Sequence, residues 1–453
     1  MKILHVSFTY YPDAVGGTEI YVKQLAACLA ERGVTSAIAA NGKCDAAYEH
    51  AGVAVHRMAV PPEDEIDKLY RAGNLNVVER FAQILAAEKP DVLHLHAFIR
   101  EITGALIIEA KHRDIPIVYT YHTPTATCMR GTLLRWGDEV CDGKMEPEDC
   151  AACFLHGLGM NRWMSGAVAQ APASLVNLGD RGLLPRRAAT ALRTCSVAAA
   201  RHAAFRAMAA DVNRIVAVAG WVRDLLIANG VQEDKISLCR HGVENRRRVS
   251  CWPARTCDGL KVVFLGRLTE AKGAHILIQA IRRAPELRLT LDLYGVVQDK
   301  AAEAYLKNLL RIARGDSRIR FHGAVASEQV PEVLRRADVL AVPSLWLETG
   351  PLVVLEAFAA GVPVMASDRG GMRELIDDEV NGWLVQAGSV NAWTQALRRL
   401  CADPEQATRV RGNIVPPRAM TVVAQEMLEI YRDVMAARPP KRESRLLTVR
   451  HAD

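Results

Sequence analysis

Two acidic residues, and the short helix that we expect to begin between them, form the stretch best suited to chemistry. Glu348 and Glu356 are separated by seven residues within SLWLETGPLVVLEAFAA. Pro351 suits the first position of a helix because its missing N–H would have no partner there, and Gly350 is then the expected N-cap. We expect this helix to run to Ala360.

The start of this helix is suited to binding an anion. The N–H groups of Leu352 and Val353 have no partners inside the helix, and an anion bound to them would have Glu348 and Glu356 on either side. A carboxylate repels an anion, so both acids are expected to accept hydrogen bonds from hydroxyl groups of the ligand. A nucleotide sugar carries hydroxyls on both sides of its diphosphate. Alternatively, the first acid is a solvated loop residue and the second lies on an exposed helix face.

Two other places along the chain are suited to phosphate. Arg267 and Lys272 stand in GRLTEAKG, directly after an apolar segment, and cations and glycines at the end of a strand can hold a diphosphate. Gly16 and Gly17 lie between an apolar strand and a helix, where the backbone can approach a phosphate. The alternatives are two solvated cations and an ordinary flexible loop.

Strands and helices alternate along the chain, which predicts parallel sheets covered by helices on both faces and ligands at the carboxyl ends of the strands. The expected strands are 3–8, 35–40, 53–58, 91–95, 116–120, 214–219, 235–238, 262–265, 288–294, 318–321, 339–342, 362–365 and 383–385. The main expected helices are 18–31, 77–88, 99–112, 183–210, 221–228, 390–401 and 421–435. Of three histidines at strand ends, His94, His96 and His122, we favour His122 as the one that faces the ligand.

The composition excludes several classes of protein. Half of the 453 residues are hydrophobic and 6% are aromatic, which is typical of a globular protein with room for two or three domains. The net charge of +6 suits an anionic ligand or membrane surface and is too small to indicate nucleic-acid binding. No signal peptide or membrane span is expected. Eleven scattered cysteines predict a reducing cytoplasm rather than a disulfide framework.

Four cysteines interrupt the alternating pattern. Cys128, Cys141, Cys150 and Cys153 fall within 26 residues and end in a C-x2-C pair. Four thiolates are a ligand set for structural zinc, although an iron–sulfur cluster also uses four cysteines. The remaining alternative is a surface insertion with free thiols.

The helix expected at 183–210 is rich in arginine. Its arginines are Arg186, Arg187, Arg193, Arg201 and Arg206, and no acid interrupts them. They form either a solvated helix face or a basic surface that meets an anionic acceptor or lipid headgroups.

Taken together, the glycine loop, G-R-x4-K-G and E-x7-E occur in an order that resembles the retaining glycosyltransferases of family 4. The resemblance covers residues 1–436 and implies the GT-B fold, in which two Rossmann-like, doubly wound α/β domains face each other across a cleft. It implies a first domain at 1–243 with the cysteine-rich insertion at about 128–153, a linker at 244–259 and a second domain at 260–415. A helix at 416–436 would return to the first domain, and 437–453 would be a loose tail.

The resemblance also implies roles for residues. Arg267 and Lys272 would hold the donor diphosphate, Glu356 would bind the ribose hydroxyls and Glu348 would lie against the donor sugar. The remaining implied positions are His122 near the reacting centre, Val325 beside the base, and the backbone of Gly16, Gly17, Gly350, Pro351, Leu352 and Val353 beside the phosphates and sugar.

Two departures from the family pattern limit this transfer. Thr123 and Pro124 stand where the family often has an acid after the histidine, so any role of that acid is absent. His241, followed by Gly242 and Val243, stands where the family has Asn-Gly-Val, a change that we expect to be tolerated.

The implied activity is transfer of a sugar, with retention and without a catalytic metal, from a UDP- or GDP-sugar to a polysaccharide or lipid-linked acceptor. The alternatives are an inactive nucleotide-sugar-binding scaffold and a GT-B epimerase. The expected location is the cytoplasm, with peripheral contact to an anionic membrane.

Overall fold

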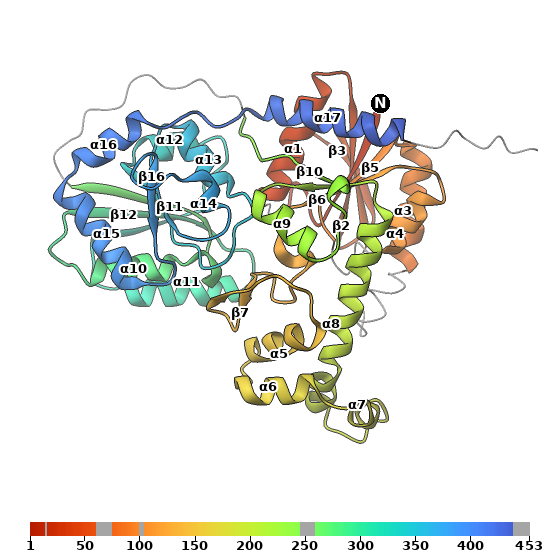
Figure 1. Ribbon diagram of the computed structural model, residues 1–453. Helices are drawn as coiled ribbons and strands as arrows, with labels where there is room; N and C mark the ends of the chain where they lie inside the picture. Colours follow the sequence, from red (N-terminus) through yellow and green to blue (C-terminus); the bar gives the residue numbers. More distant parts are fainter. Residues whose placement is uncertain (14–15, 60–74, 99–103, 245–258, 438–453) are drawn as a thin grey trace, which may run out of the picture.

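The computed structural model describes all residues except 14–15, 60–74, 99–103, 245–258 and 438–453. Almost all of the expected linker at 244–259 and of the expected tail at 437–453 therefore lies outside the described residues, as does the start of the helix expected at 99–112. The described residues form two α/β domains and a helical projection (Figure 1).

The first domain contains an eight-stranded sheet in the order β10-β9-β6-β5-β1-β2-β4-β3. Its strands are β1 Lys2–Ser7, β2 Thr35–Gly42, β3 Ala46–His50, β4 Val53–Ala59, β5 Val92–Leu95, β6 Ile117–Tyr121, β9 Arg214–Ala217 and β10 Ile236–Leu238. Its helices include α1 Gly17–Ala30, α3 Leu75–Glu88, α4 Gly104–Lys111 and α9 Gly220–Ala228. All neighbouring strands are parallel except β3, an antiparallel edge strand that the sequence analysis missed.

The second domain contains a six-stranded parallel sheet in the order β13-β12-β11-β14-β15-β16. Its strands are β11 Leu260–Arg267, β12 Leu289–Val296, β13 Ile319–Gly323, β14 Val339–Val342, β15 Val364–Ser367 and β16 Gly382–Val385. Its helices are α10 Ala274–Arg282, α11 Lys300–Ala313, α12 Val330–Arg335, α13 Leu352–Ala359, α14 Met372–Leu375, α15 Val390–Ala402 and α16 Glu405–Gly412. The expected doubly wound fold class is confirmed.

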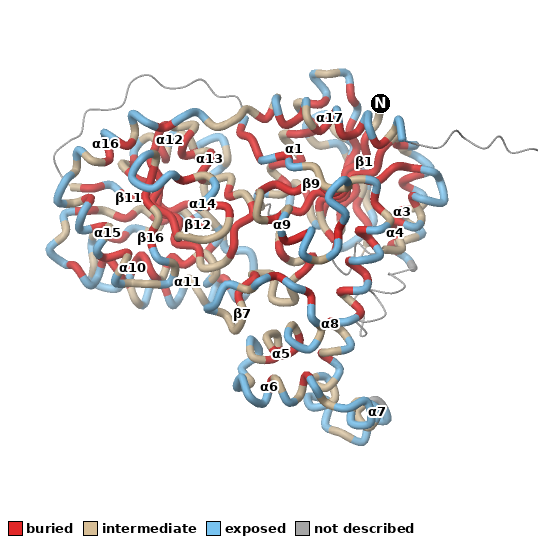
Figure 2. The backbone as a smooth tube through the Cα atoms, viewed as in Figure 1, coloured by how far each residue is buried: buried red, intermediate tan, exposed pale blue. Residues whose placement is uncertain are grey.

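The hydrophobic runs explain why the strands could be located from sequence. Helices cover both faces of each sheet, so whole strands such as β5, β6 and β14 are buried and read as apolar segments. Figure 2 shows buried residues along the two sheets and exposed residues on the outer helices.

The last helix, α17 Met420–Ala436, lies on the first domain although it follows the second domain in sequence (Figure 1). Its buried residues Val423, Met427 and Leu428 share a hydrophobic cluster with Val22 and Leu25 of α1. A parallel bridge between Val243 and Ala419 places the end of the first domain beside the start of this helix.

The cysteine-rich segment is more structured than the sequence indicated. It contains a small hairpin, β7 Leu134–Arg135 and β8 Glu139–Val140, followed by α5 Pro147–Gly157, α6 Arg162–Ala169 and α7 Ala173–Asp180. Together with the long α8 Arg186–Asp211, these helices project from the first domain (Figure 1). The sequence analysis missed the three short helices because glycines and prolines separate them and each is only two to three turns long. Among the described residues, none of the helices combines the length and the apolarity that crossing a membrane would require.

Candidate active site

The two domains meet at the start of α13. The glycine pair in front of α1 faces this helix from the first domain, since a Cβ added at Gly17 would lie 3.6 Å from Leu352 Cδ1. The fold therefore brings together the glycine pair and the acidic stretch, which are more than 300 residues apart in the sequence.

Helix α13 begins one residue later than the sequence predicted. Pro351 is the N-cap, with φ −69° and ψ 102°, rather than the first helical residue, and Gly350 precedes the cap. The helix ends at Ala359 and Gly361 adopts a left-handed conformation, with φ 68°. Neither the Leu352 nor the Val353 N–H group finds a backbone acceptor among the described residues. The shift leaves the expected anion-binding N–H groups in place.

Glu348 and Lys272 form a buried ion pair. Lys272 Nζ lies 2.6 Å from Glu348 Oε1, and the same oxygen accepts hydrogen bonds from Ser344 Oγ and Trp346 Nε1, both at 2.7 Å. Burial acts to raise the pKa of Glu348, but the charge of Lys272 and the three hydrogen bonds outweigh it, so the pKa lies below its ordinary value. The carboxylate is therefore ionised, and the sequence analysis had not foreseen that these two residues bind each other.

Arg267 is placed differently from Lys272. It is the last residue of β11 and is exposed, and its side chain has no hydrogen bond or ion pair with any of the described residues. Lys272 returns toward β14 because Gly273 adopts φ 71°, and a Cβ there would lie 2.0 Å from the carbonyl oxygen of Pro343. At the carboxyl end of β11, the GRLTEAKG segment thus contains one cation paired with an acid, Lys272, and one whose side chain is unpaired among the described residues, Arg267.

Glu356 lines a cavity of about 250 Å³ between α1 and α13. Ile20 and Gln24 contribute from α1, and Ser327 and Glu328 from the loop after β13. Val325 in that loop packs against the hydrophobic cluster beneath α13. Of the two residues expected at the ribose and the base, Glu356 lines this cavity and Val325 does not.

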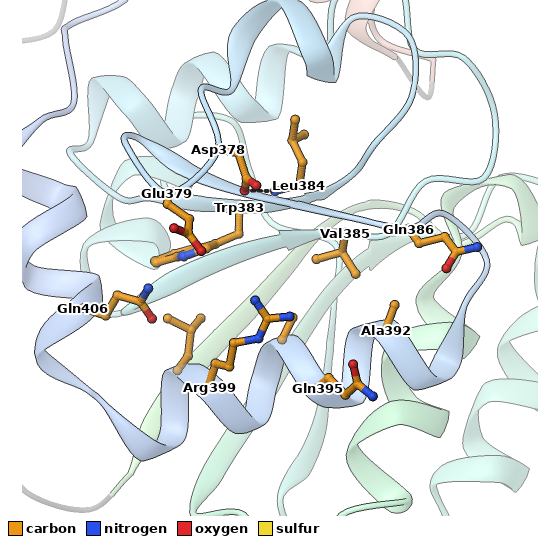
Figure 3. A pocket seen from close by; sticks show the side chains of 12 residues that line it. Asp378, Glu379, Trp383, Leu384, Val385, Gln386, Ala392, Gln395, Arg399 and Gln406 are labelled. Atoms are coloured by element: carbon orange, nitrogen blue, oxygen red, sulfur yellow. Dashed lines mark hydrogen bonds between the residues drawn. The ribbon is translucent and has the colours of Figure 1, made fainter.

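A second cavity, of about 160 Å³, lies between β16 and α15, where Asp378, Glu379, Trp383 and Arg399 line it (Figure 3). None of the residues predicted for the site lines this cavity. It lies on the outer side of the second domain and takes no part in the arrangement described above.

His122 is one member of a chain of four buried imidazoles. His5 Nδ1 lies 3.0 Å from His96 Nε2, His96 Nδ1 lies 3.0 Å from His122 Nε2, and His122 Nδ1 lies 3.3 Å from His241 Nε2. His241 Nδ1 lies 3.1 Å from the carbonyl oxygen of Gly350, in the second domain. The chain therefore runs from the central strand of the first sheet to the residue in front of the N-cap of α13.

The carbonyl at the end of the chain determines its proton positions. A carbonyl oxygen only accepts hydrogen bonds, so His241 carries its proton on Nδ1, and its unprotonated Nε2 must accept from His122. The same reasoning places the proton of His96 and of His5 on Nδ1. Ser36 Oγ, 3.3 Å from His5 Nε2, then donates at the far end. All four neutral rings thus share one tautomer, and both ring nitrogens of His122 are used within the chain.

Burial keeps these rings neutral. It lowers the pKa of His241 to about 4 and of His5 to about 3, and the pKa values of His96 and His122 lie well below the ordinary value for the same reason, with neighbouring histidines adding to the effect. The sequence analysis favoured His122 alone and missed His5 and His241. For His241 the sequence did contain an indication, because a histidine replaces the asparagine of the family pattern at this position.

His5, His94 and His96 form the one group of potential metal ligands among the described residues whose ligand atoms all lie within 4.8 Å of one another. Each of their six ring nitrogens already has a hydrogen-bond partner, including Tyr431 and Thr120 for His94. The hydrogen bonds therefore explain why these three histidines lie close together, and no metal ion is needed to explain it.

The four cysteines of the insertion lie near one another but not within that limit. Burial and then the neighbouring thiols Cys128 and Cys141 raise the pKa of Cys150 to about 12. All four are half-buried free thiols.

Comparison with known families matches both halves of the chain. Residues 16–242 match the glycosyl transferase 4-like domain, and residues 256–414 match glycosyl transferases group 1. The D-inositol 3-phosphate glycosyltransferase of Pseudarthrobacter chlorophenolicus is 27% identical over 428 residues, covering 90% of this chain and 87% of that protein.

Solved structures show the same fold. The sucrose-phosphate synthase of Thermosynechococcus elongatus superposes with a TM-score of 0.67 at 19% identity, covering 96% of this chain and 99% of that one. The Anabaena protein HepE, in complex with UDP and glucose, superposes with a TM-score of 0.63 at 17% identity, covering 96% and 100%. These two likenesses establish the GT-B fold, and the first family model spans half of the chain. The protein is therefore a glycosyltransferase that belongs to the glycosyl transferase 4-like family.

Proposed function

We propose that the protein transfers a sugar from a nucleotide-diphosphate sugar to a hydroxyl group of a polysaccharide or lipid-linked acceptor, with retention of the anomeric configuration. The observation that carries this proposal is the buried Lys272–Glu348 pair in front of α13, opposite the glycine pair of α1. An enclosed carboxylate, a cation and unpartnered helix N–H groups suit a donor that is anionic at one end and rich in hydroxyls at the other.

The donor diphosphate would be held by positive groups already in the protein. Arg267, whose side chain is unpaired among the described residues, would bind it directly, and the N–H groups of Leu352 and Val353 would donate hydrogen bonds to it at the start of α13. Lys272 would share its charge between the diphosphate and Glu348. Since these groups stabilise the departing negative charge, the proposed reaction requires no divalent ion.

Glu356 would accept hydrogen bonds from the ribose hydroxyls, because it lines the cavity between α1 and α13. Glu348 Oε1 already accepts three hydrogen bonds, so Oε2 is the atom expected to face the donor sugar.

Retention would follow from attack on the face from which the diphosphate leaves. The bond between the anomeric carbon and the phosphate oxygen breaks first, and its electron pair goes to the diphosphate. The acceptor oxygen then bonds to the same carbon and passes its proton to a diphosphate oxygen. The ring nitrogens of His122 are occupied in the imidazole chain, so this histidine would shape the site rather than take the proton.

The acceptor side of the proposal rests on the helical projection. Trp163, Leu158 and Leu183 are 81%, 72% and 66% exposed, and the exposed Arg186 and Arg187 at the start of α8 closely follow Leu183 in sequence. Exposed apolar residues beside cations suit the headgroup region of an anionic membrane. We therefore place the enzyme at the cytoplasmic surface of a membrane that carries its acceptor.

Calorimetric binding of UDP, GDP and ADP tests the donor part without knowledge of the acceptor. One nucleotide is expected to bind selectively, and Glu356→Ala should weaken it about tenfold or more through loss of a charged hydrogen bond. Glu303→Ala, an exposed acid on α11, is the matched control. If none of the three nucleotides binds, the proposal is wrong and a scaffold role becomes the better interpretation.

Liposome sedimentation tests the acceptor side. Exchanging Arg186 and Arg187 for glutamine should weaken binding to anionic vesicles and leave nucleotide binding intact, whereas Arg320→Gln on the second domain should change neither. Unchanged vesicle binding in the double variant would contradict the membrane contact.

A further inference from the structure

We propose that Cys128, Cys141, Cys150 and Cys153 together bind one structural zinc ion through four thiolates. This site lies outside the donor cleft, and its thiolates take no part in the chemistry of the proposed transfer reaction. Four cysteine thiolates around one ion are the ligand set of closed, structural zinc sites.

The hairpin positions the first part of the site. Cys141 directly follows β8, and its N–H donates to the carbonyl of Leu133 at 2.9 Å, so the hairpin pairing continues through this residue. The N–H of Gly143, two residues further on, donates to Cys141 Sγ at 3.4 Å. Such N–H···S bonds stabilise negative charge on sulfur and orient a metal-bound thiolate.

Helix α5 positions the C-x2-C pair against the same hairpin. Cys150 and Cys153 are three residues apart in this helix and therefore share a face. Cys153 Sγ accepts from the N–H of Trp136 at 3.3 Å and lies 3.7 Å from the carbonyl oxygen of Leu134, whereas Cys150 Sγ lies 3.9 Å from the carbonyl oxygen of Lys144. The pair thus contacts both ends of the hairpin segment.

Cys128 comes from the loop that leads into the hairpin. The N–H of Gly131 closes a turn on the carbonyl of Cys128 at 3.0 Å, and the Cys128 and Cys141 side chains pack against the same hydrophobic cluster. Three segments of chain therefore bring one, one and two thiols to the same region. No three of the four sulfurs all lie within 4.8 Å of one another, so we expect side-chain rotations to draw them around the ion.

The small core of the projection gives a reason for a metal. The fully buried residues of the hydrophobic cluster between α5, α6 and α8 are all alanines, and only partly buried side chains, Met129, Trp136, Cys150 and Cys195, pack against them. Alanine side chains bury little apolar surface, so this cluster contributes far less stability than the leucine-rich and valine-rich clusters of the two sheets. A metal that links three segments would supply the missing stability, as it does in small metal-dependent domains.

The site would also influence the cleft. The loop and hairpin that carry the first two cysteines touch the second domain, where the N–H of Leu347 donates to the carbonyl of Thr132 at 3.3 Å and Arg369 Nη2 donates to the carbonyl of Asp138 at 2.9 Å. Leu347 adjoins Glu348. Fixing the hairpin would therefore hold one wall of the donor site.

The test is metal analysis of the purified full-length protein, with Cys153→Ser as the variant and Cys195→Ser on α8 as the matched control. We expect one zinc ion per chain, lost in the variant and retained in the control. Hydrogen exchange should become faster in 128–157 and stay unchanged in the second sheet.

A second measurement covers the case in which the variant fails to fold. Titration of the wild-type protein with a strong chelator should release one zinc ion and increase proteolysis within 128–157, and added zinc should reverse both effects. Absence of zinc from protein purified without chelator would overturn the proposal. Iron with inorganic sulfide would overturn it in favour of a cluster. Nucleotide calorimetry is a separate readout, so failure of the zinc site and failure of the proposed transfer reaction are distinguishable.

Discussion

The two walls of the cleft are built from opposite kinds of polar group. On the first-domain side, four neutral imidazoles are joined end to end in a dry interior. On the second-domain side, a lysine and a glutamate form a buried ion pair, and the side chain of Arg267, five residues before the lysine, is unpaired among the described residues. The walls meet at residues 349–350, where Thr349 Oγ1 donates to the carbonyl of His122 and Gly350 accepts from His241.

The difference shows how each wall is prepared for a ligand. Among the described residues no carboxylate offsets the effect of burial on the pKa values of these imidazoles, so burial keeps them neutral and hydrogen-bond geometry determines where their protons lie. The charged wall depends on its partners, because Lys272 can exchange part of its interaction with Glu348 for a bound diphosphate. We infer that the neutral wall fixes the position of α13, whereas the charged wall responds to the donor.

The largest effect is expected from removing charge. Lys272→Ala should lower kcat by about 100- to 1,000-fold, since in the proposed reaction Lys272 stabilises the leaving diphosphate. It should also destabilise the fold by about 3–5 kcal/mol by leaving Glu348 buried and unpaired. Turnover of the donor identified by calorimetry and chemical denaturation measure the two effects.

Two further variants separate these effects. Lys272→Ala combined with Glu348→Gln should recover stability without recovering turnover, and exposed Lys307→Ala should change neither. Turnover within a few-fold of wild type in Lys272→Ala would show that the charged wall does not carry the chemistry.

A smaller effect is expected from disturbing the junction of the two walls. A Cβ at Gly350 would lie 2.4 Å from His241 Nδ1, so Gly350→Ala must displace the ring or the loop. We expect a loss of about 1–3 kcal/mol in the free energy of unfolding and a decrease in turnover. Gly166→Ala, in α6 with nothing within 4 Å of its added Cβ, should be neutral or slightly stabilising. Equal stability of the two variants would contradict the close packing at the junction.

The smallest effect concerns pH. The pKa of His241 is about 4 in the fold and returns to its ordinary value near 6.5 on unfolding, so between these values the unfolded chain binds more protons. Stability should therefore be fully present above pH 6.5 and decrease as pH falls toward 4. In wild type, His241 should lower the free energy of unfolding by about 2 kcal/mol as pH falls from 6.5 to 5. His241→Gln should remove this contribution.

Exposed His112 provides the control for that measurement, since His112→Gln should leave the pH dependence of unfolding unchanged. If His241→Gln also leaves the pH dependence of unfolding unchanged, the inference that the four imidazoles are neutral in the fold is wrong.

The fold could be read largely from the sequence because buried parallel strands are apolar throughout. The predicted strand 339–342 agrees with β14 without a shift, and the helix expected to run to Ala360 ends at Ala359. The projection was harder to predict because its helices are short and its core consists of alanines, so no strong apolar period marks them. Strand β3 was missed for a related reason, since a half-exposed edge strand lacks a buried run.

The candidate site divides in the same way. Residue types and local spacing determined that Glu348, Glu356, Arg267 and Lys272 lie at strand and helix ends, because turn and cap chemistry is local. Only the tertiary structure decided which side chains meet. The pairing of Lys272 with Glu348 spans 76 residues, and the contact of His241 with Gly350 spans 109. Such contacts depend on how two sheets and a returning helix pack. Burial keeps the His241 imidazole neutral, whereas Lys272 and three hydrogen bonds outweigh burial and keep the Glu348 carboxylate ionised.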